Sequence, residues 1–134
     1  MAHIETEIWL ALKDRIETIP GGLFIHYPGA VVAPTDAPFL AVGRVTARPD
    51  RVMISRGQHW LTGSITVSYV APIGQDQSVY IEQGGIIAAH FPEDLRMKYG
   101  AACVRVVSYP HVIDGYRDGA WWRTPVNIRW RCAA

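Results

Sequence analysis

The stretch 60-WLTGSITVSYVA-71 decides the fold, because apolar and polar side chains alternate along its whole length. One set comprises Leu61, Gly63, Ile65, Val67, Tyr69 and Ala71, and the other comprises Trp60, Thr62, Ser64, Thr66 and Ser68. Successive side chains of a β-strand point to opposite faces of the sheet. The alternation therefore predicts a long strand with one face in the core and the other face wet or covered.

A helix is predicted after this strand, from about Asp76 to Phe91. Asp76 or Ser78 can cap its first turn, and Pro92 ends it. The pair Gly84-Gly85 lies in its middle and lacks the spacing and the following Lys-Ser/Thr of a nucleotide loop. We interpret the two glycines as a place where the helix packs closely on a sheet.

The region before the long strand predicts a first helix over residues 3–18, ended by Pro20-Gly21-Gly22. Its apolar residues follow the helical spacing and form one stripe; they are Ile4, Ile8, Ala11, Leu12, Ile16 and Ile19. Three prolines make residues 23–38 an irregular arm. A strand over 39–47 follows, and a short one over 51–55 after the break at Arg48-Pro49-Asp50.

Two further alternating stretches, 101–109 and 122–132, predict strands separated by a loop over 110–119. Pro125 inside the second stretch indicates an edge strand or a bulge, because proline cannot donate to a ladder. Arg123, Arg129 and Arg131 of that strand share its outward face. The fold class is therefore α+β, with a mostly antiparallel twisted sheet of about four to five strands and two helices packed on one face.

The chain has 134 residues, of which 49% are hydrophobic and 19% charged, and a formal net charge of +1. These values are typical of one packed domain, here 1–134, and they argue against a dedicated nucleic-acid binder. No apolar run is long enough to cross a membrane, and the N-terminus does not resemble a signal peptide. We expect no membrane partner.

Motifs of catalysis are absent from the sequence: it has no His-Glu-x-x-His and no Gly-x-Ser-x-Gly, and its five histidines are scattered. Cys103 and Cys132 are too far apart for a redox pair, and we expect both to be reduced and packed. We therefore predict no catalytic residue, no metal, no cofactor and no enzyme activity. Two alternatives stay open: a small enzyme using His59 and His90, and a single-strand nucleic-acid-binding module over 44–60.

Tryptophan and arginine are frequent, with five tryptophans and eleven arginines in the chain. Both residue types are enriched at the energetic centres of protein interfaces. This observation favours a subunit interface over simple core packing. The interface candidates are Trp9, Trp121, Arg123, Arg129 and Arg131.

Three segments together resemble tail-terminator proteins of long-tailed bacteriophages. They are HIETEIWLALKDRIE (3–17), SITVSYVAPIGQDQSVYIEQGGIIAAHFP (64–92) and WWRTPVNIRW (121–130). The likeness lies in the order of elements and covers most of the chain. It implies a structural virion protein of the lambda-type tail terminator family, assembled in the host cytoplasm.

The resemblance also implies partners. Such proteins form a ring, usually of six copies, that caps the head-proximal end of the tail tube and stops tube polymerisation. The partners would be further copies of the chain, the tail tube protein and a head-side connector or stopper, with DNA only passing through the lumen. The alternative within this class is another connector or head-completion protein of the neck.

Loops that interrupt the alternation are candidates for contact with the tube or the neck. The two loops are 48–58 and 110–119. Their candidate residues are Arg48, Arg51, Arg56, Tyr116, Arg117 and Asp118.

Overall fold

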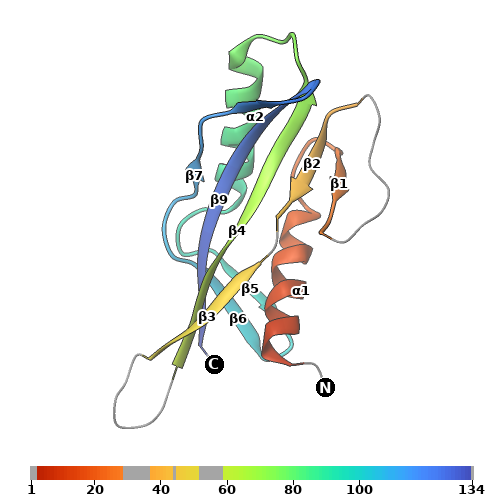
Figure 1. The fold of residues 1–134 in the computed structure, drawn as a ribbon. Helices are drawn as coiled ribbons and strands as arrows, with labels where there is room; N and C mark the ends of the chain where they lie inside the picture. The colour runs from red at the N-terminus through yellow and green to blue at the C-terminus, as the bar shows by residue number, and fades with distance from the viewer. Residues whose placement is uncertain (1–2, 29–36, 44, 52–58, 134) are drawn as a thin grey trace.

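The structure is a computed structural model that describes residues 3–28, 37–43, 45–51 and 59–133. Two helices and nine strands lie in these ranges. In chain order they are α1 (Ile4–Ile16), β1 (Phe24–His26), β2 (Phe39–Val42), β3 (Thr46–Arg51), β4 (His59–Pro72), α2 (Gln77–His90), β5 (Arg96–Tyr99), β6 (Ala102–Val106), β7 (His111–Val112), β8 (Tyr116–Asp118) and β9 (Trp121–Ala133). Figure 1 shows β4 and β9 running along most of the length of the molecule.

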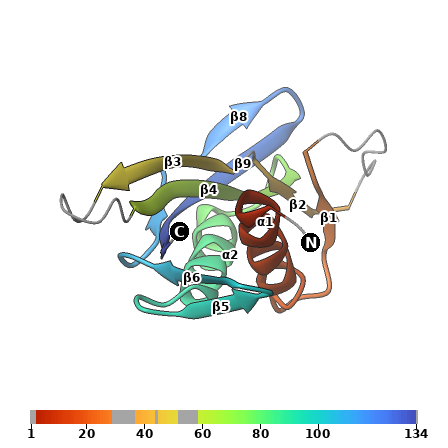
Figure 2. The same ribbon diagram turned by 90° about the horizontal axis from the view of Figure 1, so that it is seen from below.

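All nine strands belong to one sheet, whose main path runs β1-β2-β4-β9-β6-β5. β3 pairs with β4, and β7 and β8 pair with β9. The β1–β2 pair is parallel, whereas the other pairs are antiparallel. The sheet curls so that β5 and β6 lie across from β3 and β4, with both helices between them (Figure 2).

The α+β class and the two helices are confirmed, but the expected sheet is wrong. The described strands number nine rather than four to five, the sheet is mixed, and it curls around the helices. Strands of two to four residues, such as β1, β5 and β7, are too short to show alternation. They form because a neighbouring strand supplies their hydrogen-bond partners, which is an effect of tertiary structure and not of the local sequence.

The β4–β9 pair is the centre of the sheet, with a register that runs from Trp60 opposite Ala133 to Pro72 opposite Trp121. β9 is therefore not the edge strand that Pro125 suggested. The Pro125 carbonyl accepts from the Ile113 N–H at 2.8 Å, so the Pro125 nitrogen faces the same side of β9. On that side the pairing of other strands with β9 is interrupted between Val112 of β7 and Tyr116 of β8. No N–H donor is therefore required from Pro125 at this position.

The core lies between the sheet and the two helices. Ile8, Leu12 and Ile16 of α1 are buried with Tyr80 and Ile87 of α2 in one hydrophobic cluster. The apolar face of β4 and the facing residues of β9 belong to the same cluster, including Ile65, Val67, Ile128 and Trp130. The alternation read from residues 60–71 and 122–132 is therefore confirmed.

Both predicted helices are confirmed, within a few residues at each end. The Asp76 carboxylate accepts from the Ser78 N–H at 3.0 Å and caps α2 as expected. Gly84 packs closely on the sheet: a Cβ there would lie 2.9 Å from Val112 Cγ1 and 3.1 Å from Thr124 Cγ2. Gly85 has no such neighbour within 4 Å, so close packing explains only the first glycine.

Three connecting segments differ from their predictions. The arm at 23–38 contains β1, and its residues 29–36 lie outside the described ranges. The expected break at Arg48-Pro49-Asp50 is part of β3, where Pro49 pairs with Leu61. The expected loop 110–119 contains β7 and β8, because the long neighbouring strand β9 provides ladder partners for both.

The C-terminal turns of the two helices are joined by reciprocal hydrogen bonds. The Arg15 guanidinium donates to the His90 carbonyl through Nε at 3.0 Å and through a terminal nitrogen at 2.8 Å. His90 Nε2 lies 3.0 Å from the Arg15 carbonyl and 2.7 Å from Thr18 Oγ1. Burial, followed by the nearby Arg15 charge, lowers the pKa of His90 below its ordinary value. These contacts explain the presence of His90 by a structural role, namely joining the ends of the two helices.

Candidate functional site

One row of arginines crosses three adjacent strands on the side of the sheet away from the helices. Arg96 of β5 is directly opposite Arg105 of β6, and Arg105 is directly opposite Arg131 of β9. Directly opposed residues share a sheet face. Val104 and Val106, on either side of Arg105, are buried in the core, so the arginines occupy the other face.

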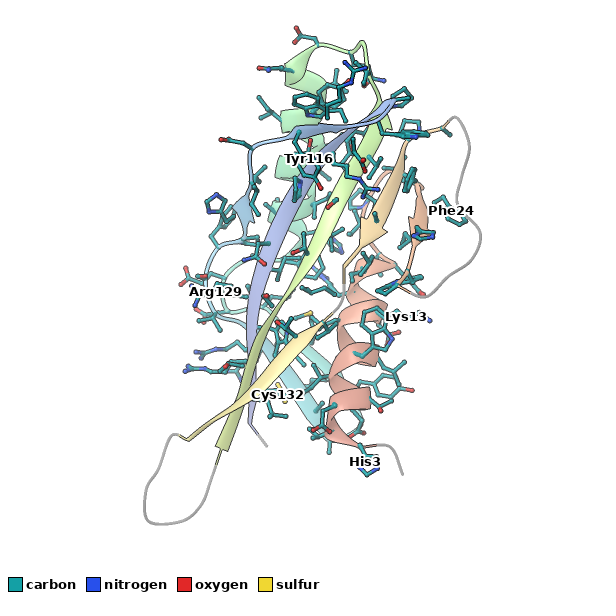
Figure 3. All side chains as sticks on the ribbon, viewed as in Figure 1. His3, Lys13, Phe24, Tyr116, Arg129 and Cys132 are labelled. Carbon is teal, nitrogen blue, oxygen red and sulfur yellow. The ribbon has the colours of Figure 1, made fainter. Side chains whose placement is uncertain are left out.

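The row continues into a wider polar surface. Arg131 is opposite Thr62, Arg129 is opposite Ser64, and Asn127 is opposite Thr66. We call this surface the arginine face, and its residues are Arg96, Arg105, Arg129, Arg131, Thr62, Ser64, Thr66 and Asn127. Figure 3 shows Arg129 projecting from β9 away from α1. The surface thus presents hydrogen-bond donors that belong to four strands.

One ion pair lies at the edge of the arginine face, between β6 and the residue that precedes β5 by two positions. Arg105 Nε lies 3.7 Å from Asp94 Oδ1, and the Asp94 side chain is 70% exposed. Asp94 has φ of 68°, just before β5. Like charges that are directly opposite across strands destabilise a sheet. Arg105 therefore lies between two other arginines of the row and beside one carboxylate.

A pocket of about 470 Å³ opens between α2, β7 and β9. We call it the α2 pocket, and its lining residues are Gln77, Tyr80, Ile81, Val112, Ile113, Asp114, Gly115, Trp122 and Thr124. The Tyr80 and Trp122 rings stack with centroids 5.7 Å apart, and the Tyr80 hydroxyl donates to the Pro72 carbonyl at 2.9 Å. These contacts hold the aromatic wall in place.

Apolar side chains extend from the α2 pocket to the surface. Ile81 is 63% exposed and Ile113 is 40% exposed, although both are large and apolar. Buried Thr124 Oγ1 has no hydrogen-bond partner among the described residues. Exposed aliphatic groups around a preformed pocket are typical of a protein contact.

The tryptophans predicted for an interface make contacts within the chain. Trp9 packs edge-on against Tyr27 with centroids 5.9 Å apart, and Trp121 packs in the same way against Phe39 at 5.5 Å. Both side chains keep part of their surface exposed. Arg123 Nε forms an ion pair with Asp118 Oδ2 at 2.7 Å. Only Arg129 and Arg131 of the five candidates lie together, on the arginine face.

The candidates for tube or neck contact lie on strands or outside the described residues. Tyr116, Arg117 and Asp118 form the exposed strand β8. Arg117 Nε donates to the Gly119 carbonyl at 3.0 Å, which supports the turn into β9. Arg48 and Arg51 belong to β3, and Arg56 lies outside the described ranges. Their contact with a tube or a neck stays a prediction.

Arg96, Arg105 and the α2 pocket are not identifiable as parts of a site from the sequence alone. The alternation of Arg105 with Val104 and Val106 is a signal for an outward arginine. Its place opposite Arg96 and Arg131 depends on strand register, which no local pattern specifies. The pocket forms from segments that are distant in the chain.

Neither a metal site nor a membrane-spanning helix emerges from the described ranges. No three His, Cys, Asp or Glu side chains there group as a metal ion would require. No helix among these residues is long and apolar enough to cross a bilayer.

Comparison with known proteins gives a family and a fold. The family model described as phage tail terminator protein matches residues 7–130. A chain in the virion of a native gene transfer agent particle has a TM-score of 0.71 at 8% identity, with 100% of both chains covered. A second solved chain, which carries no functional name, has a TM-score of 0.70 at 20% identity, covering 96% of this chain and 92% of that one.

The two solved chains show the same fold as this protein, and no curated protein sequence matches it. The family match begins within α1 and ends within β9, so it includes all of α2 and all of the strands β1 to β8. The chain belongs to the phage tail terminator family.

Proposed function

We propose that this protein forms a ring, of six copies, that caps the head-proximal end of a phage tail tube. The ring would end tube polymerisation and offer a surface to the head-side connector. The family match over residues 7–130 carries the proposal. Phage tail terminators are a structural protein family and not an enzyme family, which agrees with a role that needs no catalytic group.

A closed ring requires two different patches on each copy, joined by a rotation that closes. The α2 pocket supplies one patch with the character of a protein interface, namely aromatic walls and exposed aliphatic rims. Tyr80 and Trp122 are held by internal contacts, so little side-chain entropy is lost when a neighbour binds. We therefore assign the contact with the next copy to the α2 pocket.

Deletion of the gene in its phage tests the proposal. Without the cap, tubes should grow past their normal length, and heads and tails should accumulate separately. Electron microscopy of the lysate measures tail length and joining, and supplying the protein from a plasmid should restore both. Joined particles of normal length in the deletion strain would contradict the proposal.

The alternative role in the neck gives a different picture in the same experiment. A connector or head-completion protein acts on the head side, so its loss should leave finished tails of normal length beside unjoined heads. Labelling of the protein in assembled particles separates the two roles further. Density between the last tube ring and the connector supports the cap, whereas density inside the head vertex supports the neck protein.

A further inference from the structure

We propose that the α2 pocket of one copy binds a patch around Arg129 on the next copy, on the face of the sheet away from the helices. We call it the Arg129 patch, and its residues are Val107, Tyr109 and Arg129. The inference rests on the proposed function, because a closed ring needs a second surface that differs from the first. It goes further by naming that surface and the charges that join the two copies.

The surface of α2 beside the pocket is apolar and acidic. Ile81 lines the pocket and is 63% exposed, and the adjacent Glu82 is also exposed. Asp114 adds a second carboxylate among the residues that line the pocket. The sequence has no lysine or arginine between Arg56 and Arg96, a stretch that includes all of α2. This surface therefore favours a partner that carries both apolar and basic groups.

The Arg129 patch offers the matching groups. The Val107 N–H donates to the Arg129 carbonyl at 2.9 Å, so a 37% exposed aliphatic side chain lies beside the arginine. Tyr109 follows two residues later and is 59% exposed. His111, two residues further on, pairs with Asn127, so Tyr109 stays beside β9. Tyrosine and arginine are among the residue types that dominate the energy of protein interfaces.

The two surfaces lie on different sides of the molecule. Ile128 and Trp130, the neighbours of Arg129, are buried in the core, so Arg129 lies on the opposite face of the sheet. Both helices lie on the core side (Figure 2), and Arg129 projects away from α1 (Figure 3). One copy can therefore contact two neighbours at once, as head-to-tail assembly requires.

A second exposed tyrosine, Tyr116, lies opposite Arg123 on the same face of the sheet. Arg123 is already paired with Asp118, at 2.7 Å between Nε and Oδ2. The ion pairs between described residues do not include Arg129. Arg129 can therefore pair with a carboxylate of a second copy without breaking an ion pair of its own chain.

Gly85 favours a close approach at the same place. It follows Ile81 by one helical turn, and a Cβ at Gly85 would meet nothing within 4 Å. Glycine is less favourable than alanine inside a helix, and packing within the chain does not explain this one. The missing side chain would let Val107 or Tyr109 of the next copy approach the backbone of α2.

Charge reversal tests the inference, with each variant supplied from a plasmid to the gene-deletion strain. Glu82→Arg and Arg129→Glu each place like charges together at every contact of the ring, so joined particles should decrease by about tenfold or more. The double variant brings opposite charges together again and should restore most of the particles. Glu5→Arg, the same reversal at an exposed position of α1, is the control. It should neither reduce the number of particles nor rescue Arg129→Glu.

Cysteine cross-linking gives a second readout that does not depend on charge. A variant with both Glu82→Cys and Arg129→Cys should form disulfides between copies when purified particles are oxidised, because the two side chains would be in contact. Each single cysteine variant should remain monomeric on a non-reducing gel.

Three outcomes would overturn the inference. They are a double charge variant that is no better than its single variants, rescue of Arg129→Glu by Glu5→Arg, and an absence of cross-links in assembled particles. None of them changes the result for the wild-type protein. Failure of the wild-type protein to restore tail length in the deletion strain would instead count against the proposed function.

Discussion

His90 gives the junction between the helices a dependence on pH. Burial and Arg15 lower its pKa, so the folded protein disfavours the protonated ring. The unfolded chain, with an ordinary pKa of about 6.5, then binds more protons. Stability should therefore be complete above that value and fall as pH decreases from it toward the lowered folded pKa.

Melting temperatures measured across this pH range should show that effect. The decrease in wild-type melting temperature on acidification should be smaller in His90→Gln, whose amide can still donate to the Arg15 carbonyl but does not titrate. His111→Gln, which makes the same substitution at an exposed position outside the junction, is the control. Identical pH profiles for wild type and His90→Gln would contradict the assignment.

At the scale of elements, the two glycines of α2 should respond in opposite ways to alanine. A Cβ at Gly84 meets Val112 and Thr124, so Gly84→Ala should destabilise the protein by up to about 2 kcal/mol, because overpacking outweighs the gain in helix propensity. A Cβ at Gly85 meets nothing within 4 Å, so Gly85→Ala should stabilise it by about 0.5–1 kcal/mol through helix propensity. Urea unfolding measures both. Similar changes in the two variants would show that α2 does not lie on β7 and β9 as described.

Elements with long periodic patterns were predictable from the sequence, and short ones were not. α1, α2, β4 and β9 each bury a face that repeats over many residues, and their positions were predicted within a few residues. β5, β7 and β8 depend on ladders with β6 or β9, which are specified by tertiary contacts. For the same reason the alternation along β9 predicts that Arg129 and Arg131 point outward. It does not predict that Arg96 and Arg105 lie beside them on the same face, because that depends on strand register.

At the scale of the whole molecule, the α2 pocket should control assembly. Ile81→Asp places a charge at a helix position that is 63% exposed, so folding should be little affected. Ring formation, measured by light scattering at high concentration or by incorporation into tails, should be strongly reduced. Tyr99→Asp is the control, since Tyr99 is 40% exposed at the end of β5 and outside the pocket. Normal incorporation of Ile81→Asp would contradict the assigned contact.

The pairing of β4 with β9 also has a consequence for how the protein is made. Leu61 pairs with Cys132, so the central ladder joins residues about seventy positions apart. Such long-range contacts slow folding, because a large loop must close before they form. While the ribosome is still synthesising the chain, β4 lacks its main partner, and its apolar side chains stay accessible to chaperones. The core can form only after β9 has emerged, so we expect this domain to fold only once its whole length, from α1 to β9, has left the ribosome.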